Sequence, residues 1–539
     1  MGVLVAPVEA RRESGLARAA RRLRLWGDRA SAFAVVGAAT VLAIAIEGYH
    51  PYAEDGGIYL AGVKRLLDAG LYPHDTAFAM EPARWSAFAP MVAGLVRVMH
   101  VPLPWVVLGL HLVSVWATLF AVWMLAARCF VRGDESKNAA AAGAVVLLAC
   151  WLGLPVAGTA LYVMDPYLTA RSFATPAMLL ALLGVLDATE WEEVSAQRRR
   201  GWVMWMSGLA ICAMMHPPTA LYAGIATVVL ACLRARGREV RVGGTVAWCV
   251  MTMAAAACAQ MFAPTESAAY VRAALTRTYW FLSEWRWYEV VGIAAPAAIL
   301  GTVGWLLHGR AERDNRAMRA VARMTVIVAA IACAVALLFA REDAARHLVA
   351  RMQQLRMFQV VYVVMILMLG KWLGERVLRR RVWKWAAAVI VLGGVMFGAA
   401  RAEYAGSNHL ELPWVAPRNA WGQGFEWVRA NTPKDALFAM DADYIHAPGE
   451  DAQNFRAIAE RSVLPDASKD GGEASIAPDL AALWARGVAA QDGLSGISDA
   501  ERVARLQPLG VTWVVLEVGA KTRLECPYVN ASVRVCRVD

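Results

Sequence analysis

The chain is built largely from apolar runs of roughly 15–24 residues, separated by short polar stretches. A helix of that length crosses the hydrocarbon core of a bilayer, so each run is a candidate membrane span. Hydrophobic residues make up 59% of the chain and charged residues 18%, and the mean hydropathy is +0.43. This balance excludes an ordinary soluble domain. We expect about eleven spans, at 30–46, 104–127, 139–161, 172–188, 202–215, 219–233, 244–263, 290–308, 324–340, 357–374 and 386–400.

Basic residues orient these spans. Arginines gather in alternate loops, and the positive-inside rule assigns those loops to the cytoplasm. The net charge of +10 is therefore an orientation signal and predicts no nucleic-acid partner. We expect a basic cytoplasmic N-terminus at 1–29, retained rather than cleaved as a signal peptide. A transmembrane domain at 30–400 follows, with a long first outer loop at 47–103, and residues 401–539 then lie outside.

The outer C-terminal segment predicts an α/β domain. Cys526 and Cys536 flank two short predicted strands, and an oxidising compartment would allow them to pair, although spacing alone does not define the geometry. The fold class expected for the chain is thus an all-α polytopic transmembrane bundle with a C-terminal extracytoplasmic α/β domain. Expected strands lie at 436–440 and 511–518, expected helices at 450–460 and 478–490, and an expected flexible polar loop at 465–476.

The first outer loop begins with two adjacent carboxylates, Glu54 and Asp55. Ionised acids beside hydrocarbon are costly, so such a pair is a functional hypothesis by default. Acids also favour helix N-termini, so the pair could simply begin the helix predicted at 58–67. A later apolar stretch, 86–99, is short for a span and is expected to lie in the membrane interface.

Other polar residues cluster near the same predicted membrane face, and each has a structural alternative. Asp165 precedes a proline and could form a turn, Arg171 and Arg356 could be interfacial anchors, and His216 could only break a helical hairpin. Together they suit transfer from a lipid-linked phosphate, because a carboxylate can take the acceptor proton while arginine holds the phosphate. The candidate residues are Glu54, Asp55 and Asp165 for catalysis, and Tyr52, Tyr59, Arg171, His216 and Arg356 for substrate binding.

No motif of a soluble ATP-driven or redox enzyme is present in the sequence. With the acid pair after span one, a second acid between spans three and four, and an outer C-terminal domain, the chain resembles the GT-C superfamily of polytopic glycosyltransferases. Its first-loop stretch from Tyr52 to Tyr59 is similar to that of bacterial membrane proteins of this kind.

The resemblance implies roles for individual residues. Glu54 or Asp55 would be the catalytic base, Asp165 a second acidic or metal-linked site, and Arg356 a contact to the donor phosphate. Glu-Asp stands here where some members have Asp-x-Asp, so a divalent metal is possible but not required. The Trp-Trp-Asp signature of oligosaccharyltransferases is absent, which argues against that activity.

The expected function is transfer of a sugar from a polyprenyl-phosphate donor to an acceptor on the periplasmic side of a bacterial inner membrane. The partners would be the lipid bilayer and the lipid-linked sugar. Two alternatives stay open: a non-catalytic polytopic protein that binds or transports lipid-linked glycans, and a secondary transporter. A transporter predicts paired broken helices at the midplane, and the only such break in the sequence is Pro217-Pro218.

Overall fold

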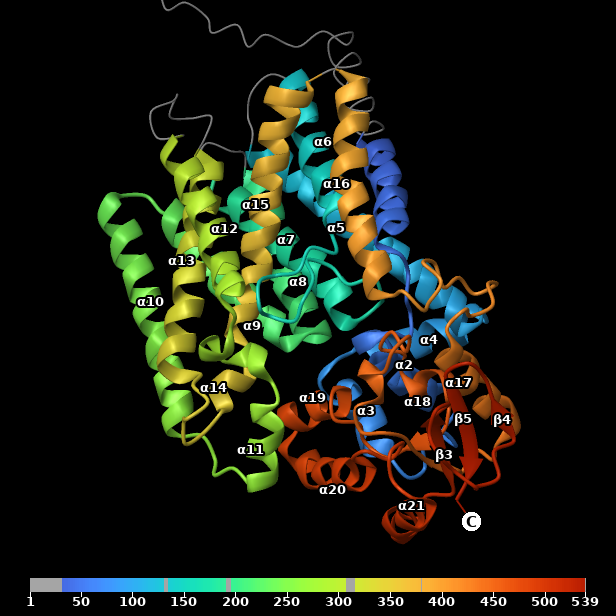
Figure 1. The fold of residues 1–539 in the computed structure, drawn as a ribbon. Helices are drawn as coiled ribbons and strands as arrows, with labels where there is room; N and C mark the ends of the chain where they lie inside the picture. Colours follow the sequence, from blue (N-terminus) through green and yellow to red (C-terminus); the bar gives the residue numbers. More distant parts are fainter. Residues whose placement is uncertain (1–31, 130–133, 191–194, 307–315, 380, 539) are drawn as a thin grey trace, which may run out of the picture.

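The computed structural model describes residues 32–129, 134–190, 195–306, 316–379 and 381–538, so the predicted segment 1–29 lies outside it. The described chain is mostly helical, and a small domain at its C-terminal end carries a β-sheet. A bundle of long helices occupies one end of the molecule, and the C-terminal domain, with the first-loop helices beside it, occupies the other (Figure 1).

Seven helical segments in the described residues are long and apolar enough to cross a membrane, the architecture of a multi-pass membrane protein. Each coincides with one expected span. They are α5 (Leu103–Cys129), α7 (Ala170–Ala188), α9 (Pro217–Arg234), α10 (Arg238–Met261), α13 (Arg316–Phe339), the segment Leu348–Leu378 and α16 (Val382–Glu403). The sixth segment comprises α14 (Leu348–Arg351), η3 (Gln354–Met357), α15 (Phe358–Trp372) and the π-helical turn η4 (Leu373–Leu378).

The four remaining expected spans also coincide with helices, but these do not meet the same length and hydropathy limits, so the count of eleven stays a prediction. They are Ala32–Glu47, α6 (Asp134–Cys150), α8 (Ser195–Met215) and α12 (Trp287–Leu306). The boundary predicted at 139–161 is wrong. Helix α6 ends at Cys150 because Gly153, Pro155 and Gly158 follow it, and the chain continues without a helix to Thr169.

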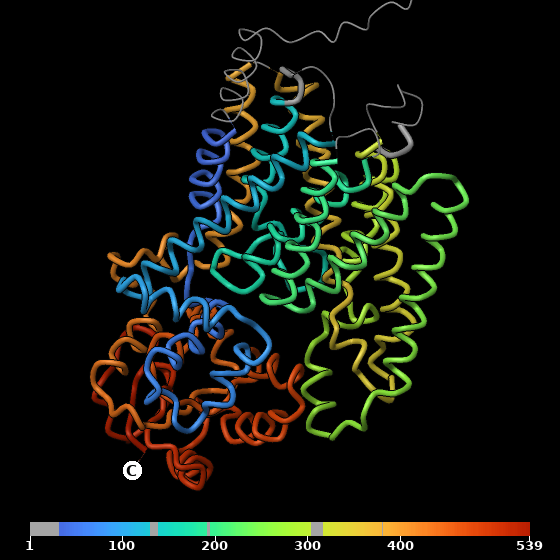
Figure 2. The backbone as a smooth tube through the Cα atoms, turned by 180° about the vertical axis from the view of Figure 1, so that it is seen from behind, coloured from blue at the N-terminus to red at the C-terminus, as the bar shows by residue number. Residues whose placement is uncertain are grey.

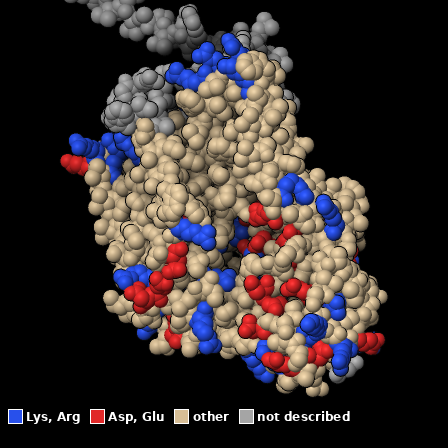
Figure 3. All heavy atoms as spheres, in the orientation of Figure 1, with Lys and Arg blue, Asp and Glu red and all other residues tan. Residues whose placement is uncertain are grey.

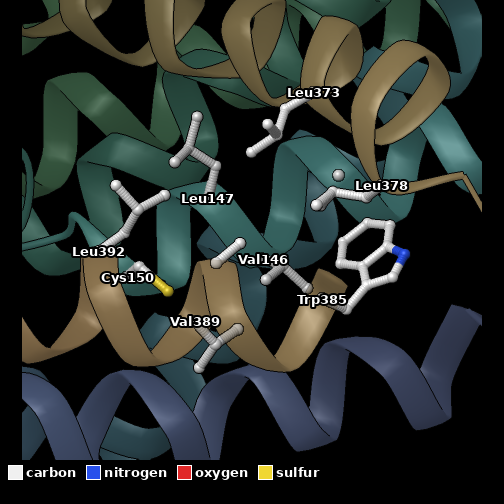
Figure 4. A pocket seen from close by; sticks show the side chains of 10 residues that line it. Val146, Leu147, Cys150, Leu373, Leu378, Trp385, Val389 and Leu392 are labelled. Atoms are coloured by element: carbon white, nitrogen blue, oxygen red, sulfur yellow. The ribbon is translucent and has the colours of Figure 1, made fainter. Parts of the chain in front are cut away.

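Small residues allow helices of the bundle to pack closely. A Cβ atom added to Gly143 of α6 would lie 2.2 Å from the carbonyl oxygen of Gly370 on α15. Beside this contact, an apolar pocket of about 10 Å³ lies between α6, η4 and α16, lined by side chains such as Leu147, Leu373 and Trp385 (Figure 4). Its lining is almost wholly aliphatic, so it offers no chemistry for a polar substrate.

The C-terminal domain is a five-stranded sheet in the order β2-β1-β3-β5-β4, parallel from β2 to β3 and antiparallel from β3 to β4. Phe438 and Trp513 pack on one face of the sheet, and Val514 and Leu516 on the other. Both faces are covered, which is why the central strand is an apolar run. The elements are α17 (Ala420–Asn431), β1 (Leu437–Ala439), η5 (Tyr444–His446), α18 (Phe455–Ala459), β2 (Ser462–Val463), α19 (Lys469–Ile476), η6 (Pro478–Leu480), α20 (Ala481–Gln491), α21 (Asp499–Leu506), η7 (Gln507–Leu509), β3 (Trp513–Glu517), β4 (Tyr528–Val529) and β5 (Val533–Arg537).

Most elements predicted in this domain are present, and one is not. The strands at 436–440 and 511–518 correspond to β1 and β3, and the domain contains a disulfide between Cys526 and Cys536. The flexible loop predicted at 465–476 is wrong, because most of it forms the helix α19, with Asp470, Glu473 and Ser475 buried. The polarity of this segment misled the prediction, because a polar segment can form a helix when its polar side chains are buried with partners, as Asp470 is.

The first outer loop lies between the bundle and the C-terminal domain. Its helices are α2 (Glu54–Leu67), α3 (Thr76–Trp85) and α4 (Phe88–Met99). Seen from behind, this blue segment lies against the orange and red C-terminal domain (Figure 2). Helix α4 has 12 residues and is too short to span, in agreement with the interfacial placement expected for it.

Between α11 (Ala268–Leu275) and α12, two short turns, η1 (Thr278–Trp280) and η2 (Leu282–Glu284), connect the bundle to the same end of the molecule. Lys and Arg side chains gather at the opposite end, and a band with few charges separates the two (Figure 3). We call the end that carries the C-terminal domain the domain end.

Candidate active site at the domain end

The carboxylate pair lies at the start of α2, where two glycines follow it. A Cβ atom added to Gly56 would lie 2.8 Å from the Tyr167 Cβ atom, and one added to Gly57 would lie 2.1 Å from the Asn454 Cβ atom. The start of α2 is therefore wedged between the loop after α6 and the C-terminal domain. Both side chains remain accessible, with Glu54 31% and Asp55 30% exposed.

Arg171 joins Asp55 to Asp165. One of its guanidinium nitrogens lies 3.0 Å from Asp55 Oδ2 and another 2.9 Å from Asp165 Oδ2. Arg171 lies in the first turn of α7, which begins with a capping box formed by Thr169 and Ser172. Three candidates from two widely separated parts of the chain thus form one cluster in the structure.

Asp165 is the buried member of this cluster, with 6% of its surface exposed. Burial raises the pKa of the Asp165 carboxyl, and the charge of Asp55 acts in the same direction, whereas Arg171 opposes both. Asp165 therefore has the more hindered carboxyl, and Asp55 the one that a substrate can reach.

Lys469 completes the cluster, and the sequence analysis missed it. Its ammonium group is bonded to a Glu54 carboxylate oxygen and lies 3.6 Å from Asp55 Oδ1. Burial lowers the pKa of Lys469 to about 8, and the two carboxylates beside it favour its charged form, so it is a cation at neutral pH. Nothing in the sequence indicated this contact, since 415 residues separate the two partners.

Tyr59 and Arg356 border the cluster without a direct bond to its carboxylates. Tyr59 lies one turn after Asp55 on α2, and burial raises its pKa to about 12, with the charges of Arg171, Asp55 and Arg356 all acting on it. Arg356 stacks over the Tyr279 ring at 5.0 Å and donates a hydrogen bond of 3.4 Å from Nε to the Thr159 carbonyl oxygen. The charge of Arg356 also acts to lower the pKa of Asp165.

His216 and Tyr52 each take part in structural contacts. His216 caps α9, and its Nδ1 accepts the Thr219 backbone N–H at 3.3 Å, a structural contact; burial, with the charges of Arg171 and Arg356, lowers its pKa. Tyr52 packs between the first loop and the C-terminal domain, with the Lys64 ammonium 5.4 Å from its ring centre.

The surface is hollowed between the bundle and the C-terminal domain, where acidic and basic side chains meet (Figure 3). Within the described ranges, no group of three or more His, Cys, Asp or Glu side chains has a geometry that could hold a metal ion. The cations that the structure places around the carboxylates are thus Arg171, Lys469 and, across the gap, Arg356.

Comparison with known proteins adds little at the sequence level. No family model matches the chain, and no curated protein matches it. Among solved structures, the chain is similar to the crystal structure of the Archaeoglobus fulgidus oligosaccharyltransferase in its apo form. The two are 12% identical, the match covers 90% of this chain and 69% of that one, and the TM-score is 0.44. A likeness at this level assigns neither a family nor an activity to the chain.

Proposed function

We propose that this protein is a membrane glycosyltransferase of the GT-C type, which transfers a sugar from a polyprenyl-phosphate donor on the periplasmic side of a bacterial inner membrane. The observation that carries the proposal is the cluster of Asp55, Arg171, Asp165 and Lys469 at one end of a helical bundle. It combines an accessible carboxylate with cations next to apolar helices, which is the chemistry that a lipid phosphate donor requires.

The reaction would be a direct displacement. The acceptor oxygen attacks the anomeric carbon of the sugar as Asp55 takes the acceptor proton, and the bond from that carbon to the phosphate oxygen breaks. The electron pair of this bond leaves with the polyprenyl phosphate, whose growing negative charge the arginines neutralise. We assign the role of general base to Asp55 because its carboxylate contacts Arg171 of the bundle, whereas the Glu54 carboxylate contacts Lys469 of the C-terminal domain.

The first test compares Asp55→Asn with Glu54→Gln. Membranes containing each variant are incubated with a panel of radiolabelled polyprenyl-phosphate sugars, and label transferred to membrane acceptors is counted. Loss of a general base lowers turnover by about 100- to 10,000-fold, and we expect this loss for Asp55→Asn and a smaller one for Glu54→Gln.

Asp68→Asn is the matched control, because Asp68 belongs to the same loop and forms an exposed ion pair with Lys434. It should transfer like the wild type. Full transfer by a properly inserted Asp55→Asn protein would exclude the enzymatic proposal and favour a non-catalytic protein that binds lipid-linked glycans.

A further inference from the structure

Helix α19 is held at its first turn by two separate contacts. The Asp466 carboxylate accepts the backbone N–H of Lys469 at 2.5 Å. Arg277, which follows α11 of the bundle, donates to the carbonyl oxygen of Ser468 at 2.8 Å. The backbone of Lys469 is therefore positioned from within its own domain and from the bundle.

A third contact holds the next residue. Asp470 accepts two hydrogen bonds from Arg456, at 2.7 and 2.9 Å, and Arg456 also bonds to Asp75 of the first loop. All three side chains are buried. This bridge ties α19 to the first loop, so the backbone that carries the Lys469 side chain is held firmly in place. Such support favours a defined geometry in a binding site.

The Lys469 side chain points from this base toward the accessible carboxylates, and 18% of it is exposed. Other lysines join the same two parts of the molecule in a different manner. Lys434 contacts one carboxylate, Asp68, and both are largely open to solvent, at 65% and 45% exposed. Lys469 alone of these contacts both residues of the catalytic pair.

Four elements border the space around Tyr59. Asp55 comes from α2, Arg171 from α7, Arg356 from η3 and Glu473 from α19, and the charge of each acts on the Tyr59 hydroxyl. Arg171 of the bundle and Lys469 of the C-terminal domain contact the two oxygens of the Asp55 carboxylate, at 3.0 and 3.6 Å. An anion placed between them would meet positive groups from both the bundle and the C-terminal domain.

We propose that Lys469 binds the phosphate of the lipid-linked donor, so that the C-terminal domain supplies part of the donor site. This inference rests on the function proposed above. The phosphate carries one negative charge as a diester in the donor and close to two as the departing polyprenyl phosphate. The incoming phosphate would take Lys469 from Glu54, and both carboxylates would then lose the cation that they share.

Binding of undecaprenyl phosphate tests this without catalysis. The full-length protein in lipid nanodiscs is titrated with undecaprenyl phosphate and with undecaprenol, which lacks the phosphate, and binding is followed by tryptophan fluorescence. Lys469→Met keeps the apolar stem, and loss of one charged hydrogen bond should weaken phosphate binding by about 10-fold or more. Lys469→Arg should bind within about 3-fold of the wild type, and Lys434→Met should match the wild type.

Kinetics separate binding from a purely structural role. With a donor that the wild type uses, Lys469→Met should raise the donor KM more than it lowers kcat. Lys469→Arg should have a donor KM close to that of the wild type. Unchanged phosphate binding by Lys469→Met, with Asp55→Asn inactive, would overturn this inference and leave the proposed function standing. If the wild type binds undecaprenyl phosphate and undecaprenol equally well, both this inference and the proposed function are overturned.

Discussion

At the scale of single residues, Glu54 has an unfavourable backbone conformation. Its φ of 51° lies in the left-handed region, where a residue with a Cβ atom costs about 1 kcal/mol or more relative to glycine. The chain keeps a glutamate at a position that suits glycine, and its side chain is the one bonded to Lys469. Backbone strain and a partnered carboxylate at the same residue are typical of functional sites.

Asp55, Asp165 and Arg171 could be predicted to meet because each lies at the end of an apolar run. Hydropathy places such residues at the same depth in a membrane, and the alternation of spans places them at the same face. Lys469 could not be predicted, since a contact between a loop and a distant domain depends on tertiary packing that no local pattern encodes.

Burial of Glu473 makes the stability of the fold depend on pH. Burial raises the pKa of Glu473 well above its usual value, and Asp470 adds to this while Arg456 opposes it. An unfolded glutamate titrates near pH 4.3, so the folded state binds the extra proton. The contribution of this proton to the free energy of unfolding is complete below the pKa of the unfolded glutamate. It is lost as the pH rises through the raised pKa of Glu473 in the folded state.

Glu473→Gln should remove this dependence. Both carboxylate oxygens of Glu473 are buried without a hydrogen-bond partner, and a neutral amide imitates the protonated acid. We expect a Tm close to that of the wild type at pH 5 and a higher Tm at pH 8, measured by thermal unfolding of the purified protein. Glu501→Gln, at an exposed residue of α21, is the control, and an equal pH response in Glu473→Gln and wild type would refute the argument.

At the scale of elements, α2 is the part of the molecule that brings the carboxylate pair to its partners. The two glycines after the pair let the helix approach both the bundle loop and α18, so the Glu-Asp-Gly-Gly motif combines chemistry with close packing. The helix itself was predictable from its apolar period, and its start at Glu54 agrees with the alternative that the acid pair begins it. The bond from the Glu54 N–H to the Ala452 carbonyl was not predictable.

Gly57→Ala tests this role of α2. The new methyl group would overlap Asn454, and overpacking of this kind costs about 1–3 kcal/mol. Gly94→Ala on α4 meets nothing within 4 Å and should be neutral or stabilising by about 0.5–1 kcal/mol. Denaturant unfolding of both variants gives the comparison, and equal stabilities would show that α2 does not pack as tightly as described.

At the scale of the whole molecule, two features favour the orientation that the sequence predicts. Basic side chains gather at the end opposite the C-terminal domain (Figure 3), and the domain contains a disulfide, which suits an oxidising compartment. Span positions were predictable because membrane helices are defined by length and hydropathy. The end of α6 was misjudged because an apolar loop and an apolar helix look alike in hydropathy.

Reporter fusions check the orientation. Alkaline phosphatase, which is active only outside the cytoplasm, should be active when fused after residue 538 and inactive when fused after residue 236, between α9 and α10. Green fluorescent protein should show the reverse pattern. Phosphatase activity of the fusion at residue 236 would show that the topology is the reverse of the predicted one, with the carboxylate cluster on the cytoplasmic side.

The distance along the chain between α2 and α19 also sets an order of assembly. Arg171 is synthesised early and can neutralise Asp55 while the later helices are still being made. Lys469 is synthesised only after every helix of the bundle, so its contact with Glu54 forms only once the C-terminal domain has been made and has folded. A partly synthesised protein would contain Glu54 and Asp55 without Lys469. The complete cluster is therefore present only in a protein whose synthesis and folding are finished.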